Sequence, residues 1–456
     1  MKKFILIFIL LPFLIYPQSL KYKLNKVLND KFFDTCLVSI QVEDLVTNKT
    51  LFKKNEKMLL RPASNMKILT SSAGLIYLGP DYEFKTDLYT DGYVLNDTLF
   101  GNLYFVGGCD PDFTTKDFYY FVDELKSQSV SVIMGNLYGD VTFKDSLYWG
   151  KGWMWDDDPS SNAPYLSALN LNDNCVEVFF DGAKDSIIIS PKTKFVSSKR
   201  IKNDEKLIID RNWFYRKNEI IVEGQNDGFN HYAKVNVLNP ALYFLTVFKE
   251  VLDSNLIQLA GDLNLKTNSA NSNLIYSFKR KYSDVIPNLN KTSDNLSAEM
   301  TLYAIAEKYY GKPATADSGI QIVDMMIDSL ELNHKNYRIV DGSGVSHYNV
   351  VSAELISKLL KYLYDRKPEL FKILYDSFPI AGVDGDLNNR MINTETQNNV
   401  HAKTGTLTGV CSLSGYVQNK NGHFLTFSII MQSFVGRSKI PRDFQDEICK
   451  ILAESK

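Results

Sequence analysis

Residues 61–67 read Arg-Pro-Ala-Ser-Asn-Met-Lys, and an apolar helical pattern continues from them to Leu78 and stops at Gly79. Proline near the start and glycine just past the end are typical boundaries of an α-helix. Residues three positions apart share a helix face, so Ser64 in the first turn and Lys67 one turn later can touch. The sequence therefore predicts a helix over 65–78 that places a serine hydroxyl beside a lysine amine.

A serine beside a lysine can act as a nucleophile. The hydroxyl is weak until a neighbouring base removes its proton. A lysine that is desolvated, or that lies near other cations, can have a lowered pKa and act as that base. Ser64 begins the only Ser-x-x-Lys in the chain. The same pair can equally be an ordinary helix start with an exposed lysine, so this motif alone does not decide the function.

A second motif, Ser-Asp-Asn at 293–295, precedes a helical pattern over 298–310. It includes Ser293 and Asn295, and its plain alternative is a helix cap. Ser-x-Asn also occurs at 160–162 and 269–271. We favour the copy at 293 because of its helical context and its place in the chain.

A third motif, Lys-Thr-Gly at 403–405, occurs once. It can be read as a solvated edge strand or as a strand that lines a cleft. In the second interpretation Lys403, Thr404 and Thr406 hold a substrate carboxylate. Gly405 lets a substrate backbone approach closely because it has no side chain.

Taken in this order, the three motifs match the set found in β-lactamases and penicillin-binding proteins. Longer stretches resemble one group in particular, the class C low-molecular-mass penicillin-binding proteins, which form the D-alanyl-D-alanine carboxypeptidase/endopeptidase family. Cys109 departs from this pattern, because a small residue is commoner there. The stretches that carry the resemblance lie at 107–111, 152–157, 163–172, 341–352, 379–385 and 402–409.

The spacing of the motifs favours this family over compact β-lactamases. Ser64 and Ser293 lie 229 positions apart, which leaves room for an insert of short β-like segments. The nearest match to a β-lactamase deacylation glutamate, at 329–333, is interpreted as a helix end followed by a loop. We expect an α+β fold: a serine β-lactamase/transpeptidase-like catalytic domain, an antiparallel sheet flanked by helices, split over 20–90 and 278–456. A large, mainly β insert occupies 91–277.

The resemblance implies a role for each motif residue. Ser64 attacks the carbonyl between two D-alanines, and Lys67 takes its proton. Ser293 relays protons to the leaving amine, Asn295 binds a substrate amide, and the backbone N–H groups of Ser64 and Thr406 stabilise the oxyanion. No cofactor and no metal are expected. The expected ligands are peptidoglycan stem peptides and β-lactam inhibitors.

An acidic aromatic stretch at 152–158, Gly-Trp-Met-Trp-Asp-Asp-Asp, allows two interpretations. It can be a buried aromatic anchor followed by a solvated acidic turn. Alternatively, Asp157 binds the cationic amine that the third residue of a stem peptide, or the cross-linked centre of a neighbouring peptide, carries.

The remaining features of the sequence limit localisation and partners. A net charge of −2 argues against nucleic acid as the main partner. Two lysines and an apolar run within residues 1–19 read as a signal peptide, which predicts export to the periplasm or cell envelope, with an uncleaved membrane anchor as the alternative. The five scattered cysteines are expected to be mostly buried thiols, and the scattered histidines argue against a metal site. A homodimer is compatible with the sequence, which does not decide the oligomeric state.

Two rival functions remain open at this point. One is a β-lactamase or esterase with the same fold, which rapid turnover of penicillin would favour. The other is a catalytically silent wall-binding protein, which failure to label with a fluorescent penicillin would favour.

Overall fold

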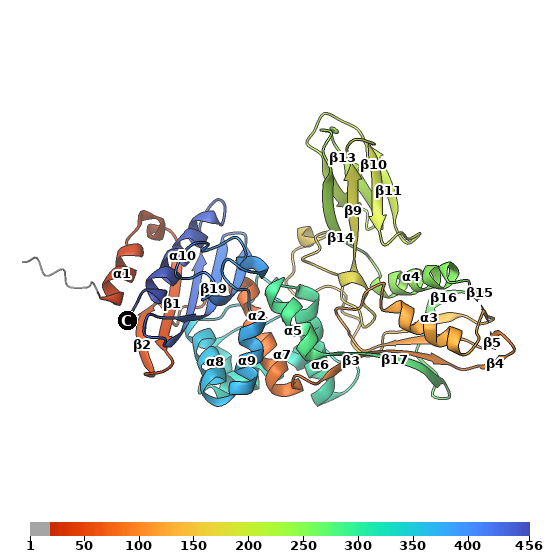
Figure 1. Ribbon diagram of the computed structural model, residues 1–456, viewed down its shortest axis with the longest axis horizontal. Helices are drawn as coiled ribbons and strands as arrows, with labels where there is room; N and C mark the ends of the chain where they lie inside the picture. Colours follow the sequence, from red (N-terminus) through yellow and green to blue (C-terminus); the bar gives the residue numbers. More distant parts are fainter. Residues whose placement is uncertain (1–18) are drawn as a thin grey trace, which may run out of the picture.

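The structure, a computed structural model, describes residues 19–456, so the predicted signal peptide lies outside the described residues except for Ser19. Figure 1 shows that the N-terminal and C-terminal segments share one part of the molecule, while the middle of the chain extends away from it. The segments that carry the three motifs, far apart in sequence, therefore come together in one part.

A five-stranded antiparallel sheet with the order β18-β19-β20-β1-β2 forms the centre of this part. The N-terminal strand β1 pairs with β20, with Ile40 opposite Ile429. Alternating apolar residues near 38–52 and 411–431, the second around an Asn-Gly turn at 421–422, predict two hairpins, and both are present. The strands are β1 (Leu37–Asp44), β2 (Lys49–Lys54), β18 (His401–Leu407), β19 (Val410–Gln418) and β20 (Phe424–Gln432).

Helices cover both faces of the sheet, which explains why β19 is buried from Val410 to Val417. The helices α1 (Leu20–Val27) and α10 (Lys439–Ala453) share one apolar cluster with β1 and β19. The helix α8 (Ala353–Arg366) contributes to the cluster on the other face. Figure 1 shows α1 beside α10, and α8 on the opposite side of the strands. This arrangement confirms the predicted α+β class.

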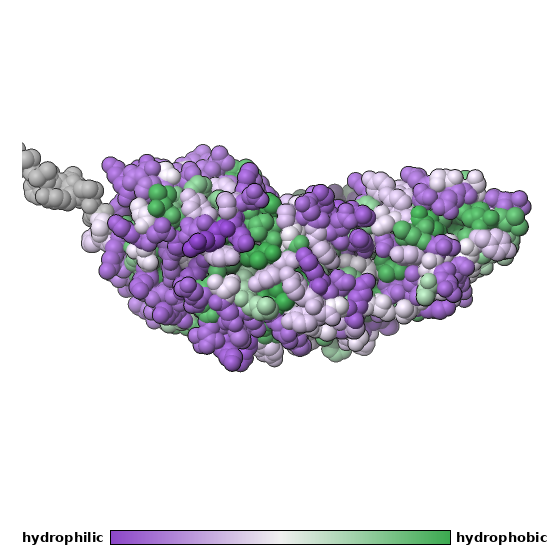
Figure 2. Space-filling view, turned by 90° about the horizontal axis from the view of Figure 1, so that it is seen from below, coloured by the Kyte–Doolittle hydropathy of each residue, from purple (hydrophilic) through white to green (hydrophobic). Residues whose placement is uncertain are grey.

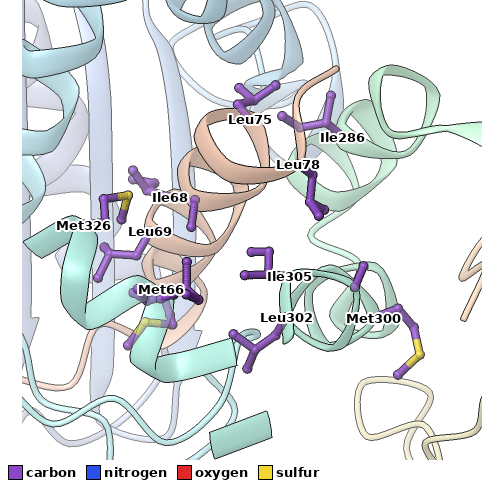
Figure 3. Packing of buried hydrophobic residues seen from close by; sticks show 14 of the residues in the cluster. Met66, Ile68, Leu69, Leu75, Leu78, Ile286, Met300, Leu302, Ile305 and Met326 are labelled. Carbon is purple, nitrogen blue, oxygen red and sulfur yellow. The ribbon is translucent and has the colours of Figure 1, made fainter. Parts of the chain in front are cut away.

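The helix that carries the first motif packs in this same cluster with α8, and its central part, residues 66–73, is buried throughout. It comprises a 3-10 turn (Ala63–Asn65), α2 (Met66–Ala73) and a π-helical turn (Gly74–Leu78), so the predicted helix over 65–78 is confirmed. Figure 3 shows Ile68 and Leu69 of α2 in the same apolar cluster as Leu302 and Ile305 of the next helix layer. Each such side chain contributes roughly 1.5–3 kcal/mol on burial, so this packing fixes α2 firmly. The surrounding helices are α5 (Tyr282–Lys291), α6 (Asn295–Tyr310), α7 (Ala316–Ser329) and α9 (Pro368–Ser377).

The middle of the chain first forms a five-stranded sheet with the order β16-β8-β6-β3-β17. Its antiparallel strands β3 and β17 carry the chain out of the catalytic part and back into it. A small four-stranded sheet, β15-β7-β5-β4, continues at its far end. The strands are β3 (Glu83–Thr90), β4 (Tyr93–Leu95), β5 (Thr98–Phe100), β6 (Leu103–Gly107), β7 (Val132–Ile133), β8 (Leu137–Asp140), β15 (Gln258–Leu259), β16 (Leu263–Leu265) and β17 (Asn273–Lys281). The boundaries proposed at 90/91 and 277/278 stay predictions.

Two helices pack on this sheet, α3 (Phe118–Ser127) and α4 (Pro240–Ser254). The ring of Phe105 on β6 meets Phe121 and Phe244 edge to face at 5.0 and 4.9 Å between centroids. The sequence predicts a helix over 240–252, which α4 confirms, within segments that otherwise look β-like. It does not predict α3, because the aromatic-rich sequence of α3 favours a strand. Its buried residues recur at helical spacing, so tertiary packing decides this segment against local propensity.

A second unit projects from the insert and is entirely β (Figure 1). It contains two three-stranded sheets with the orders β10-β9-β14 and β11-β13-β12. The strands are β9 (Cys175–Asp181), β10 (Ser186–Ser190), β11 (Ser197–Ile201), β12 (Ile208–Arg211), β13 (Glu219–Glu223) and β14 (His231–Asn236).

All five cysteines are buried free thiols, as predicted. Among residues 19–456, none of the helices has both the length and the apolarity needed to cross a membrane. Figure 2 shows apolar surface near the end of the insert that carries β4 and β5, where Val94, Leu95 and Phe100 are exposed.

Candidate active site

Ser64 lies at the start of the buried helix α2 and lines a cleft of about 500 Å³. Lys67 is completely buried directly behind it. The Nζ of Lys67 donates to Ser64 Oγ over 3.1 Å and to the backbone oxygen of Ser343 over 2.7 Å. It also donates to Oδ1 of Asn295. The predicted contact between the serine and the lysine is therefore present, and the alternative of an exposed lysine is wrong.

Burial lowers the pKa of Lys67 to about 8, because the low-dielectric interior disfavours the ammonium form. The nearby acids Asp294, Asp341 and Glu299 act in the opposite direction and limit this decrease. A lysine with a pKa near neutrality can release its proton and then accept another, as a general base must.

The second motif lies at the N-terminus of α6, beside the first. Ser293 lines the cleft and has a left-handed backbone with φ of 61°. The carboxylate of Asp294 accepts from the backbone N–H of Ser297 over 2.6 Å, so this residue caps α6. The helix-cap interpretation of this motif is therefore correct for Asp294, while the adjacent Ser293 faces the cleft.

The side-chain amide of Asn295 is engaged at both ends within the protein. Its Oδ1 accepts from Lys67, and its Nδ2 donates to the backbone oxygen of Asn162 over 2.5 Å. Asn162 belongs to a Ser-x-Asn copy that the sequence argument set aside, yet Ser160 and Asn162 line the same cleft. The insert therefore supplies part of the wall, and Asn295 connects that wall to Lys67.

The third motif lies on β18, the edge strand of the sheet, next to the start of α2. The side chain of Asn65 donates to the backbone oxygen of Lys403 over 2.8 Å and holds the helix to the strand. Lys403 is fully buried. Burial, together with the charge of Lys67, lowers the pKa of Lys403 to about 7. Two desolvated amines therefore lie close together at the base of the cleft.

Hydroxyl groups of this strand are held by charged neighbours that sequence reasoning missed. Thr404 donates to a carboxylate oxygen of Asp386 over 2.8 Å. Arg442 donates to Oγ1 of Thr406 over 3.2 Å. Asp386 and Arg442 both line the cleft, as does Arg390. No local motif marks these three residues, because helices and loops distant in sequence bring them to β18.

Gly405 has a close neighbour within the protein itself. A Cβ built on Gly405 would lie 2.8 Å from the backbone oxygen of Pro62 and 3.0 Å from the backbone nitrogen of Ser64. It would also lie 2.2 Å from Oγ of Ser412. A side chain at this position would therefore push β18 away from Ser64, whatever space the substrate needs.

The loop 341–349 supports the base, although sequence reasoning gave it no role beyond the resemblance. The buried carboxylate of Asp341 accepts from the backbone N–H groups of Gly344 over 2.9 Å and Ser346 over 2.7 Å. It also accepts from the indole of Trp153 over 2.9 Å. These bonds fix the loop whose Ser343 oxygen accepts from Lys67.

The acidic aromatic stretch contains the predicted buried anchor, and it places Asp157 at the cleft, while binding of an amine by Asp157 stays a prediction. Trp153 is buried and anchors the segment on Asp341, whereas Trp155 is 68% exposed. Asp157 lines the cleft, and its carboxylate accepts from the backbone N–H of Met154 over 2.7 Å. Partial burial raises the pKa of Asp157.

One group of acids among residues 19–456 is close enough to share a cation: Asp112, Asp173 and Asp294 have carboxylate oxygens within 4.8 Å of one another. Lys234 forms an ion pair with Asp173 and supplies positive charge there. Burial raises the pKa of Asp112 to about 8. The positive charge of Lys234 and the raised pKa of Asp112, which favours its neutral form, offset part of the negative charge of these three acids without a metal ion.

Comparisons with known proteins agree with this geometry. The D-Ala-D-Ala carboxypeptidase 3 (S13) family matches residues 20–455. The chain is 27% identical to D-alanyl-D-alanine carboxypeptidase DacB of Haemophilus influenzae over 86% of this chain and 84% of that protein. It is 28% identical to a D-alanyl-D-alanine carboxypeptidase of Actinomadura sp., over 96% of this chain and 85% of that protein.

A solved structure shows the same fold. Penicillin binding protein 4 (dacB) from Haemophilus influenzae superposes with a TM-score of 0.85 at 24% identity, covering 94% of this chain and 99% of that one. The family resemblance inferred from the motifs is thereby confirmed. The chain belongs to the D-Ala-D-Ala carboxypeptidase 3 (S13) family and is an enzyme of that class.

Proposed function

We propose that this enzyme hydrolyses the D-alanyl-D-alanine end of peptidoglycan stem peptides, or their cross-links, through an acyl-enzyme on Ser64. The observation that carries the proposal is the 3.1 Å contact between Ser64 Oγ and the buried amine of Lys67. In its neutral form Lys67 accepts the hydroxyl proton while Ser64 attacks the carbonyl between the two D-alanines.

The oxyanion and the leaving group need separate partners. The backbone N–H groups of Ser64 and Thr406 stabilise the oxyanion. Ser293, on the cleft wall, relays the proton to the amine that leaves as D-alanine or as the amino end of a cross-linked peptide. Water then attacks the acyl-enzyme, releases the shortened peptide and restores the hydroxyl of Ser64.

Substrate binding uses the other motif residues. Lys403, Thr404 and Thr406 hold the terminal carboxylate, with Arg442 supporting the hydroxyl of Thr406. Asn295 keeps Lys67 in place, and its Nδ2 must exchange its bond to Asn162 when it binds a substrate amide. Asp157 at the cleft wall pairs with the amine of the third stem residue.

The same machinery binds β-lactams, whose strained carbonyl and carboxylate resemble the D-alanyl terminus. Relatives support this, since the Haemophilus influenzae protein has been solved as a complex with a β-lactam. The substrate and the predicted signal peptide are consistent with a periplasmic or cell-envelope location. The homodimer stays a prediction without a structural argument.

A direct test incubates purified protein with a pentapeptide that ends in D-alanyl-D-alanine, and with cross-linked wall fragments. Mass spectrometry should detect release of one D-alanine, or scission of the cross-link, and Ser64→Ala should abolish both. Fast, repeated turnover of penicillin with intact wall peptides would contradict the proposal and favour the β-lactamase alternative.

A further inference from the structure

A second cleft, of about 370 Å³, lies beside the catalytic one and has no role in the mechanism above. We call it the aromatic cleft. The segment 148–165 and the loop between β12 and β13 form it from opposite sides. Its principal lining residues are Tyr148, Trp149, Trp155, Trp213, Phe214 and Arg216.

The aromatic rings of this cleft are unusually open to solvent. Trp155 is 68% exposed and Phe214 is 72% exposed. The rings of Trp155 and Trp213 lie 5.0 Å apart between centroids, tilted by 41°. Contiguous exposed apolar surface of this kind commonly marks a binding site. Packing within the described chain does not account for it, because the ring of Trp155 is mostly uncovered.

The polar groups of the cleft limit the kind of ligand. Asp158 is already engaged by the guanidinium of Arg211 and the hydroxyl of Tyr165, so the floor is rigid and its charge is balanced. Arg216 is exposed, lies 5.9 Å from the ring centroid of Tyr148 and has no carboxylate partner within residues 19–456. The cleft therefore offers aromatic faces together with free N–H donors.

This combination suits a pyranose ring. The C–H faces of a sugar stack on indole rings, whose faces are electron-rich, while its hydroxyl and acetamido oxygens accept hydrogen bonds from a guanidinium. A wholly apolar peptide would leave Arg216 without a partner. A pocket of this size with convergent aromatic and polar groups is typical of small-ligand sites.

The position of the cleft connects it to the catalytic site. Trp155 and Asp157 belong to one 3-10 helix, and they line the aromatic cleft and the catalytic cleft respectively. Their Cα atoms can be at most about 7 Å apart. In a stem peptide, two residues separate the third residue from the N-acetylated amino sugar that carries the peptide. A peptide whose third residue meets Asp157 can therefore direct its sugar towards Trp155.

We propose that the aromatic cleft binds the N-acetylated amino sugar of the glycan, so that the enzyme prefers glycan-linked stem peptides to free ones. This inference rests on the proposed function, which supplies the peptide in the catalytic cleft.

The test compares two substrates that share one peptide, a disaccharide-linked pentapeptide and the free pentapeptide. The readout is the ratio of their kcat/KM values for D-alanine release. We expect Trp213→Ala and Trp155→Ala to lower this ratio about three- to tenfold. Trp213→Phe, which keeps an aromatic face, should retain most of it. Tyr93→Ala is the matched control, because Tyr93 is 64% exposed on the distant strand β4.

A ratio that neither tryptophan substitution changes would overturn the inference, and so would an equal loss on both substrates. Binding of the peptide-free disaccharide to the Ser64→Ala protein can be measured through tryptophan fluorescence. This measurement tests the aromatic cleft without catalysis. Saturable quenching that Trp213→Ala abolishes would support it, and no response would contradict it. Failure of the wild-type protein to cleave either peptide would instead refute the proposed function, while the fluorescence result would still report on the cleft.

Discussion

The amine of Lys67 lies 3.1 Å from the hydroxyl oxygen of Ser64 and 2.7 Å from the backbone oxygen of Ser343. One lysine thus connects the proposed nucleophile to a loop that a buried carboxylate, Asp341, holds in place. The proposed chemistry depends on this position as much as on the identity of the lysine.

The first prediction concerns covalent labelling. Wild-type protein incubated with penicillin should gain the mass of one β-lactam and lose it slowly, because no deacylation glutamate was found in the sequence. Ser64→Ala should gain none, since the attacking oxygen is missing. Intact-mass spectrometry measures both. An adduct on the Ser64→Ala protein would show that another residue is the nucleophile.

The second prediction assigns different roles to the two buried lysines. Lys67→Ala should reduce turnover of every substrate about 10²–10⁴-fold, the usual contribution of a general base. Lys403→Ala should mainly impair substrates with a free terminal carboxylate. The measurement is kcat/KM for a peptide acid and its amide with each variant. Equal sensitivity of acid and amide to Lys403→Ala would contradict its role in carboxylate binding.

The third prediction concerns pH. The pKa of Lys67 is lowered to about 8, so its neutral, basic form predominates only above that pH. Acylation by a substrate with a blocked carboxyl should therefore accelerate as the pH rises through about 8. The pKa of Lys403 is lowered to about 7, so this lysine loses its positive charge as the pH rises above that value. Binding of a substrate with a free terminal carboxylate should therefore weaken over the same pH range in which Lys67 becomes basic. Stopped-flow measurement of the acylation rate across pH 6–10 should give a lower pH optimum for free acids than for substrates with a blocked carboxyl. Identical pH profiles for the two would argue against the roles assigned to Lys67 and Lys403.

The fourth prediction tests Asp157 by charge alone. Asp157→Asn removes the negative charge but keeps an oxygen that can accept from the backbone of Met154. Cleavage of peptides with an amine on the third residue should fall, whereas acylation by a simple penicillin should change much less. Asp157→Ala, which also loses the cap, serves as the comparison. Parallel losses on peptide and penicillin would indicate a folding role.

The fifth prediction concerns the insert as a support for the base. Trp153→Phe removes the indole N–H that Asp341 accepts and leaves the carboxylate with one partner fewer. The free energy of unfolding should decrease by about 1.5–3 kcal/mol, the usual contribution of a hydrogen bond to a charged group, since Asp341 keeps its backbone donors. Acylation should slow as well, because Asp341 orders the Ser343 loop. Chemical denaturation and penicillin labelling of the same preparation measure both. If Trp153→Phe has the stability and the penicillin labelling of the wild-type protein, Trp153 does not support the base through Asp341.

The sequence by itself determined the elements whose signals are local. The apolar period after Ser64, stopped at Gly79, specified the helix, and the Asn-Gly turn near 421–422 specified the final hairpin. The order of the three motifs identified the family, because each motif is a short run of adjacent residues. The same local logic failed for α3, whose aromatic residues favour strand until the core of the insert selects a helical face.

Only the tertiary structure decided which other side chains complete the site. Asp386 and Arg442 come from a separate loop and helix, and nothing in their neighbouring residues marks them. Asp341 lies in a stretch that carried the resemblance, but its bonds to the Ser343 loop could not be read from it. Asn162 reaches Asn295 across 133 positions of the chain. Such contacts arise when packing brings distant segments together, and a single sequence records local periodicity but no distances. The burial that lowers the pKa values of Lys67 and Lys403 has the same origin, since desolvation depends on the whole surrounding fold.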